Sequence, residues 1–254
     1  AIMSPNQRKV LEVGYEALHG AGFSKASLQG CPIMVYIGDC GTEWANQLLV
    51  MRHFGVYADS GKFEPKQTRA SKLDWEGAGS LSVVGSRLSY TLSMTGPVSH
   101  FDTACSSGLT AFCTAMYSLR VDFLSLTLGS HVRGALAGGV NQIVDPAFYI
   151  GNSAQHMLSL KGRCFTFDMG GDGYGRGEGT SMVYTTFGKE ERDLELQEGC
   201  AIGNKVNQDG RSASMTAPNG PSQQMCIKAS LREAQVGPHD ITASECHGTG
   251  TSLG

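Results

Sequence analysis

The sequence predicts an α/β protein built on a largely parallel sheet. Three short apolar runs bounded by glycine or polar residues, 32–38, 134–140 and 180–187, have the length and composition of strands buried on both faces. Segments with helical spacing lie between them, as expected when helices connect parallel strands. No Pro/Ser-rich linker or block of like charge divides the 254 residues, and 41% of them are hydrophobic. We therefore expect one domain over residues 1–254.

Composition argues against several classes of protein. The net charge is −3, with 20 basic and 23 acidic residues scattered along the chain, so no surface for nucleic acid or an anionic membrane is indicated. No apolar run approaches the roughly 20 residues of a membrane span, and the start AIMSPNQRK has no signal-peptide core. The eight cysteines form no C-x-x-C pair, so neither zinc nor a disulfide framework is predicted. We expect a soluble cytoplasmic protein with reduced thiols. Location in an organelle is the alternative.

The first element is a helix over residues 4–20. Ser4 is expected to cap it, with Pro5 at the first helical position and Gln7 reaching back to complete a capping box. One apolar face then continues to Gly20 through Leu11, Tyr15 and Leu18.

Residues 32–38, PIMVYIG, are predicted to be a buried strand, and residues 81–91, LSVVGSRLSYT, are predicted to be a helix leading toward the central strand. The segment 39–80 between them is polar and aromatic. Its larger side chains could line a substrate or dimer surface, but ordinary packing is the favoured interpretation. These side chains are Trp44, His53, Arg69 and Trp75.

Residues 98–117, VSHFDTACSSGLTAFCTAMY, are predicted to be the centre of the protein. A β-branched and aromatic run breaks at Thr103 and continues into an apolar helix, which places Cys105 at a strand-to-helix turn. A helix N-terminus stabilises a thiolate, and the small neighbouring residues leave room for a second molecule to approach the sulfur. Most cysteines are inert small hydrophobes. Cys105 is nevertheless a candidate nucleophile because of this setting.

The second half repeats the strand and helix pattern. Residues 134–140, GALAGGV, read as a buried strand whose small residues let a helix pack very close, and 180–187 read as a third strand. Between them lies a charged, glycine-rich loop with Asp168, Asp172, Arg176 and Glu178. The D-x-x-x-D spacing of this loop suggests a metal site, and the stretch GGDGYGRGEG suggests a nucleotide-binding loop. An internally paired structural loop is favoured over both interpretations.

The last elements bring a histidine to a glycine-rich turn. Pro221 opens a helix that carries Met225, Ile227 and Leu231 along one side and ends near Gly237. Residues 241–245 then read as a strand that delivers His247, followed by Gly-Thr-Gly-Thr. A histidine beside two threonines on such a turn suits a polar ligand, although a structural role is commoner for histidine in general.

The stretch DTACSSGLTA resembles the active-site signature of β-ketoacyl synthases, specifically the ketosynthase domains of type I polyketide synthases. Further segments resemble ketosynthase landmarks in the family's order: SPNQRKVLEVGYEAL, AGGVNQIVDP, GRCFTFDMGGDGYGRGEG, GNKVNQDGRSASMTAPNGPSQ and ECHGTGTSLG. The resemblance implies the thiolase-like fold, a layered α/β/α/β/α arrangement. It covers almost the whole chain, which corresponds to a single ketosynthase domain lacking the family's first and last parts.

The same resemblance implies an acyltransferase that performs a decarboxylative Claisen condensation in polyketide biosynthesis. Cys105 would hold the acyl group, with its backbone N–H as one arm of an oxyanion hole, and His247 matches the first of the family's two histidines. Thr216, Thr249 and Thr251 match positions that contact the phosphopantetheine arm of the acyl carrier protein. No cofactor or metal is expected to bind directly.

The expected partners are the acyl carrier protein, other polyketide synthase domains and a second copy of the chain. The resemblance implies a homodimer with residues 98–102 near its two-fold axis.

Departures from the family pattern are modest. Cys246 stands where alanine is usual, and Gly108 replaces the third serine after the nucleophile. The family's later lysine and second histidine have no counterpart in the sequence. We expect these 254 residues alone not to complete the condensation.

Four alternatives compete with this interpretation. A fatty acid synthase condensing domain is the nearest, with VNQDG and TAPNGPSQ favouring the polyketide side. A non-catalytic ketosynthase-like scaffold would have no need of Cys105 and His247. Thiolase lacks the HGTGT arrangement, and a papain-like hydrolase would carry a different local signature around its cysteine.

Overall fold

A computed structural model describes residues 3–41, 43–53, 77, 79–121, 133–187, 195–214 and 216–251. Trp75 and Arg69 lie outside the described residues, as does the side chain of His53. The chain divides into two compact units, one of residues 1–145 with 178–198 and the other of 146–177 with 199–254. Each unit is described by itself, and the expectation of one domain stays a prediction.

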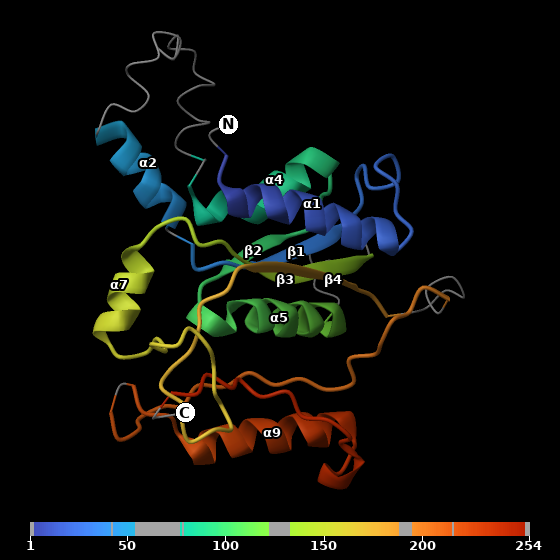
Figure 1. Cartoon of the computed structure of the whole chain (residues 1–254). Helices are drawn as coiled ribbons and strands as arrows, with labels where there is room; N and C mark the ends of the chain where they lie inside the picture. Colours follow the sequence, from blue (N-terminus) through green and yellow to red (C-terminus); the bar gives the residue numbers. More distant parts are fainter. Residues whose placement is uncertain are drawn as a thin grey trace. The chain divides into compact units, whose positions relative to one another are not determined.

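The first unit is a four-stranded sheet covered by helices on both faces. In chain order its main elements are α1 (Pro5–Gly20), β1 (Ile33–Gly38), α2 (Glu43–His53), α4 (Leu81–Leu92), β2 (Val98–Phe101), α5 (Ser107–Val121), β3 (Gly134–Asn141) and β4 (Gly179–Thr185). Helices α1 and α4 cover one face, and α5 covers the other (Figure 1). The predicted strands and the predicted helices of this unit are confirmed.

The sheet is largely parallel, as predicted. Its strand order is β2-β1-β3-β4; β1 pairs in parallel with β2 and β3, and β4 runs antiparallel to β3. Because β1, β2 and β3 share one direction, their carboxyl ends meet at the same edge. Gly38 of β1 is there in register with Phe101 of β2 and with Gly139 of β3.

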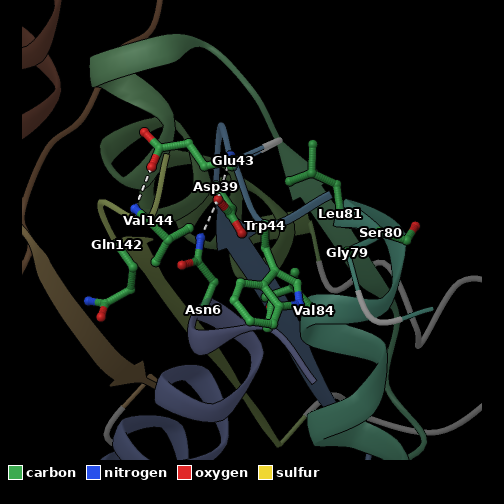
Figure 2. A pocket seen from close by; sticks show the side chains of 12 residues that line it. Asn6, Asp39, Glu43, Trp44, Gly79, Ser80, Leu81, Val84, Gln142 and Val144 are labelled. Atoms are coloured by element: carbon green, nitrogen blue, oxygen red, sulfur yellow. Dashed lines mark hydrogen bonds between the residues drawn. The ribbon is translucent and has the colours of Figure 1, made fainter. Parts of the chain in front are cut away.

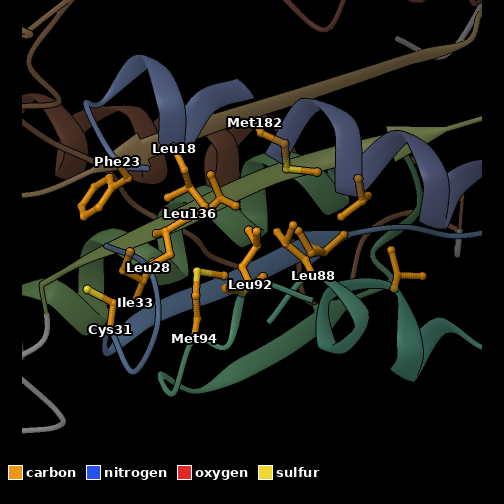
Figure 3. Packing of buried hydrophobic residues seen from close by; sticks show 14 of the residues in the cluster. Leu18, Phe23, Leu28, Cys31, Ile33, Leu88, Leu92, Met94, Leu136 and Met182 are labelled. Atoms are coloured by element: carbon orange, nitrogen blue, oxygen red, sulfur yellow. The ribbon is translucent and has the colours of Figure 1, made fainter. Parts of the chain in front are cut away.

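Strand β1 is buried along its whole length, and its side chains alternate between two hydrophobic clusters. Ile33, Val35 and Ile37 belong to the cluster under α1 and α4, whereas Met34 and Tyr36 belong to the cluster under α5. Figure 3 shows the first cluster, in which residues of the helices meet the sheet, among them Leu18, Leu88, Leu136 and Met182. On the opposite face, small residues let α5 pack close; these are Ala111, Ala115, Ala135 and Ala137.

The start of α1 corrects one prediction. Ser4 caps the helix as expected, because its hydroxyl accepts the Gln7 N–H at 3.1 Å. The reciprocal arm of the capping box does not form. The Gln7 side chain is fully buried, and its amide donates instead to the Gly77 carbonyl at 2.8 Å. A tertiary contact has replaced the local one, and the other amide atom, Oε1, has no hydrogen-bond partner among the described residues.

The second unit contains α7 (Ala147–Ala154), α9 (Gly220–Ala234) and a short 3-10 turn at Pro238–Asp240. Helix α9 is confirmed: Asn219 caps it, and its side chain accepts the Ser222 N–H. Its Met225 and Ile227 are 63% and 59% exposed. The predicted strand over 241–245 is wrong, because these residues are irregular and exposed. They pair with no strand among the described residues, and a strand is stable only in a ladder.

Candidate functional site

Cys105 lies on a tight turn between β2 and α5, as the sequence predicts. Residues Ala104–Ser106 form a single turn of 3-10 helix, which leads directly into α5 at Ser107. Ala104 adopts a left-handed conformation with φ 53°, so the chain bends sharply one residue before the cysteine. The Cys105 side chain is exposed. The thiol therefore stands at the outer side of the turn, where a second molecule can reach it.

Side-chain hydrogen bonds hold this turn in shape. Asp102 accepts the Ala104 N–H at 3.2 Å, which supports the left-handed residue in an Asx-type turn. The buried Ser107 hydroxyl accepts the Thr103 N–H at 2.8 Å and donates to the Ala104 carbonyl at 2.6 Å. Ser106 donates to the Thr103 carbonyl at 2.9 Å. The hydroxyls of the signature thus shape the turn around the cysteine.

Glycines bring the turn onto the edge of the sheet. A Cβ on Gly38 at the end of β1 would lie 2.3 Å from the Ser107 carbonyl carbon, closer than any real contact. A Cβ on Gly139 of β3 would lie 3.1 Å from the Gly108 Cα. The predicted close packing of a helix on residues 134–140 is confirmed at this point. The N-terminus of α5, and Cys105 with it, therefore sits at the carboxyl ends of the parallel strands.

Buried polar residues tie together the loops that follow β1 and β3 (Figure 2). Asp39 is 2% exposed and accepts hydrogen bonds from the Asn6 amide at 3.0 Å and the Gly41 N–H at 2.7 Å. Burial raises the pKa of Asp39, and the negative charge of Asp102 adds to the rise. Glu43 accepts the N–H of Val144 at 2.6 Å.

These residues surround a small cavity with a volume of about 10 Å³, which is room for one water molecule. Trp44 also lines this cavity. The cluster is part of the scaffold behind the Cys105 edge, in line with the packing role expected for Trp44.

The second unit brings His247, Thr249 and Thr251 together. They line a cavity of about 580 Å³, whose walls are residues 246–251, residues of the 165–171 loop and the start of α9. His247 is exposed, and the two threonine hydroxyls lie 3.3 Å apart. Gly248 and Gly250 have φ of 60° and 65°, which residues with a Cβ rarely adopt. The alternating Gly-Thr pattern therefore makes the turn that places both hydroxyls in one cavity.

Thr216 is exposed and is not among the residues that line this cavity, although Pro218 is. The lining also includes Phe165, Thr166 and Phe167, which the sequence interpretation did not select. They lie within the landmark GRCFTFDMGGDGYGRGEG, but that resemblance does not show their contact with the distant 246–251 turn. Cys105 belongs to the first unit and His247 to the second.

The charged loop around Asp168 contains internal hydrogen bonds, and Asp168 also lines the cavity of His247. Asp168 accepts the Gly170 N–H at 2.6 Å, and Asp172 accepts the Ser159 hydroxyl. The Arg176 guanidinium lies over the ring of Tyr149, 4.9 Å from its centroid. In the described parts of the chain, no group of three or more His, Cys, Asp or Glu side chains is arranged to hold a metal ion. Among the helices described, none combines the length and apolar character needed to cross a bilayer.

Comparison with known proteins agrees with this geometry. The model of the Beta-ketoacyl synthase, N-terminal domain, matches residues 1–185, and that of the C-terminal domain matches residues 199–254. The polyketide synthase type I Pks15/1 of Mycobacterium bovis, named for phenolphthiocerol synthesis, is 37% identical over 253 residues, covering 99% of this chain and 11% of that protein. Erythronolide synthase EryA3 of Saccharopolyspora erythraea is 38% identical over 254 residues, covering 99% and 7%.

The solved structures include the ketosynthase from module 6 of the bacillaene synthase from Bacillus subtilis 168. It superposes with a TM-score of 0.77 at 28% identity, covering 98% of this chain and 38% of that one. The thiolase-like layered α/β fold is thereby confirmed. The chain spans roughly a tenth of the length of the curated relatives and under two-fifths of this ketosynthase chain. The resemblance first suggested by the Cys105 signature is confirmed, and the chain belongs to the β-ketoacyl synthase family.

Proposed function

We propose that this chain is the ketosynthase part of a type I polyketide synthase and takes part in decarboxylative Claisen condensation. The observation that carries the proposal is the exposed Cys105 on a strained turn at the carboxyl edge of the parallel sheet, within a β-ketoacyl synthase sequence. A nucleophile held there by glycine packing and serine hydrogen bonds is fixed in position before its substrate arrives.

In the first step, the Cys105 thiolate attacks the carbonyl of an incoming acyl thioester. A new carbon–sulfur bond forms to Cys105, the bond to the carrier sulfur breaks, and the carrier thiolate takes up the proton that the cysteine lost. The acyl group then waits on the enzyme as a thioester.

In the second step, a malonyl-type thioester loses carbon dioxide, and the electron pair of the broken carbon–carbon bond forms an enolate. His247 donates a hydrogen bond to the thioester carbonyl and stabilises this negative charge. The enolate carbon attacks the acyl carbonyl on Cys105, which forms the new carbon–carbon bond and releases the Cys105 thiolate. The product is a β-ketoacyl thioester on the carrier.

The proposed carrier is the phosphopantetheine arm of an acyl carrier protein, which is a substrate and not a resident cofactor. The paired hydroxyls of Thr249 and Thr251 in the same cavity as His247 support this, because the arm offers amide groups to such donors and acceptors. Thr216, two residues before the cavity-lining Pro218, is proposed to contact the arm as well.

We further propose a homodimer of the full-length protein, working in the cytoplasm beside other polyketide synthase domains. Within the described sheet, β2 pairs only with β1. Its other edge, at residues 98–102, is therefore where we place the second copy of the chain. Light scattering at micromolar concentration should give the mass of a dimer. A purely monomeric mass would reject this part of the proposal.

Two alternatives are less well supported. The relatives reported above are polyketide synthases, which favours that pathway over fatty acid synthesis. A non-catalytic scaffold would need neither the strained turn at Cys105 nor the histidine at 247.

The test of the proposal is release of carbon dioxide from malonyl acyl carrier protein radiolabelled at the free carboxyl, using the full-length protein. The wild type should release label, and His247→Ala should reduce release at least about tenfold, since one hydrogen bond to a developing charge has been removed. Equal release by the wild type and His247→Ala would reject the role of His247.

A further inference from the structure

A cavity threonine from a distant segment of the chain contacts the histidine turn through its side chain. Thr166 donates its hydroxyl to the Gly248 carbonyl at 2.6 Å, across 82 residues of sequence. Gly248 directly follows His247, and Thr166 lines the same cavity as the histidine and the two threonines. A short hydrogen bond from a half-buried side chain fixes the backbone next to the imidazole.

The same loop holds the turn at a second point. The Gly173 N–H donates to the Gly250 carbonyl at 3.1 Å. Gly173 packs closely against the backbone of Leu158: a Cβ added to Gly173 would lie 2.6 Å from the Leu158 carbonyl carbon. The next residue, Tyr174, pairs with Leu158 in a β-bridge. The second anchor is thus a backbone group next to Tyr174, which is itself hydrogen-bonded to Met157 and Ser159.

Both left-handed glycines of the turn are therefore tied through their carbonyls to residues 165–174. With the two glycines held in this way, the hydroxyls of Thr249 and Thr251 lie together in the cavity. Glycine is the least conformationally restricted residue, so a turn containing two glycines loses more conformational entropy when it is fixed, and outside contacts offset this cost. Thr166 supplies such a contact at the residue directly after His247.

We propose that Thr166 is a positioning residue, which orients His247 for decarboxylation by holding the Gly248 carbonyl. The inference rests on the proposed function of His247 and deepens it. Thr166 itself is not expected to touch the reacting atoms. Its effect should therefore fall on the step that needs His247 and leave acyl transfer to Cys105 unchanged.

The test uses the full-length protein with Thr166→Val, which keeps the shape of threonine and removes the donor. Two rates are measured: label released from malonyl acyl carrier protein at saturating concentration, and acylation of the protein by acetyl acyl carrier protein, followed by intact mass. Thr166→Val should slow release about tenfold and change acylation less than about twofold. Thr166→Ser retains the donor and should restore release to within about twofold of the wild type.

The matched control is Thr91→Val. Thr91 donates its hydroxyl to the Arg87 carbonyl at 2.8 Å in α4, so the same substitution removes the same kind of bond away from the His247 turn. Both rates should stay at the wild-type level in this control.

Three results would overturn the inference. One is an unchanged release by Thr166→Val while His247→Ala is impaired, in which case the proposed function stands and only the role of Thr166 is wrong. Another is a parallel loss of release and acylation, which would indicate general damage to the fold. The third is a failure of serine to restore release. If His247→Ala itself releases label normally, the proposed function fails, and the inference fails with it.

Discussion

A Cβ on Gly38 would lie 2.3 Å from the carbonyl carbon of Ser107, because the end of β1 runs directly against the first turn of α5. The two residues are 69 positions apart in sequence, and their contact fixes where the Cys105 turn stands on the sheet. Nothing in this contact is flexible, since the nearest atoms all belong to the backbone.

We predict that Gly38→Ala destabilises the protein by about 3 kcal/mol, because α5 must move to admit the methyl group. The displacement should also slow acylation of Cys105. Urea unfolding of both proteins measures the first effect. Gly20→Ala is the control, because a Cβ at Gly20 meets nothing within 4 Å, and it should change stability by less than about 1 kcal/mol. Equal stability of Gly38→Ala and the wild type would contradict the packing described.

Ala104 gives a second prediction, because its φ of 53° is unfavourable for any residue with a Cβ. Ala104→Gly should be more stable than the wild type by about 1 kcal/mol, the strain that glycine avoids. Ala17→Gly in the ordinary helical backbone of α1 should instead lose about 1 kcal/mol. Chemical denaturation of the two variants distinguishes these signs, and a loss of stability in both would show that Ala104 is not strained.

His100 on β2 provides a pH-dependent prediction. Its Nε2 accepts the Gly85 N–H at 2.8 Å, and burial lowers its pKa from the ordinary value of 6.5. The unfolded chain therefore binds a proton more readily than the folded one, so stability should fall as the pH drops below about 6.5 toward the folded pKa. The free energy of unfolding of His100→Gln, measured with urea, should decrease less between about pH 7 and pH 5 than that of the wild type. Identical pH dependence in the two proteins would remove His100 as the cause.

The sequence predicted the elements whose signals are local. Strand β1 was identified from an unbroken apolar run, and the cap at Ser4 from a serine before proline. The Cys105 turn was identified from a strand pattern that changes to helical spacing within a few residues. These features depend on residues close together in the chain, which is why the pattern was sufficient.

The features that were missed depend on tertiary contacts. Gln7 bonds to Gly77 instead of completing the capping box, and residues 241–245 have β-like composition but no paired strand among the described residues. Thr166 reaches Gly248 across 82 residues, so the local motif that contains it does not show this contact. The residue types near Cys105 and His247 suggested reactive chemistry, but their roles in one reaction came from family resemblance.

The most direct test of the account is intact mass after incubation of the full-length protein with an acyl thioester. The wild type should gain one acyl group, and peptide mapping should place it on Cys105. Cys105→Ser should gain none under the same conditions, because a serine hydroxyl is a far weaker nucleophile. Cys246→Ser, which removes the exposed thiol beside His247, should still gain one. Acylation of Cys105→Ser, or mapping of the acyl group to Cys113 or Cys246 in the wild type, would contradict the central claim.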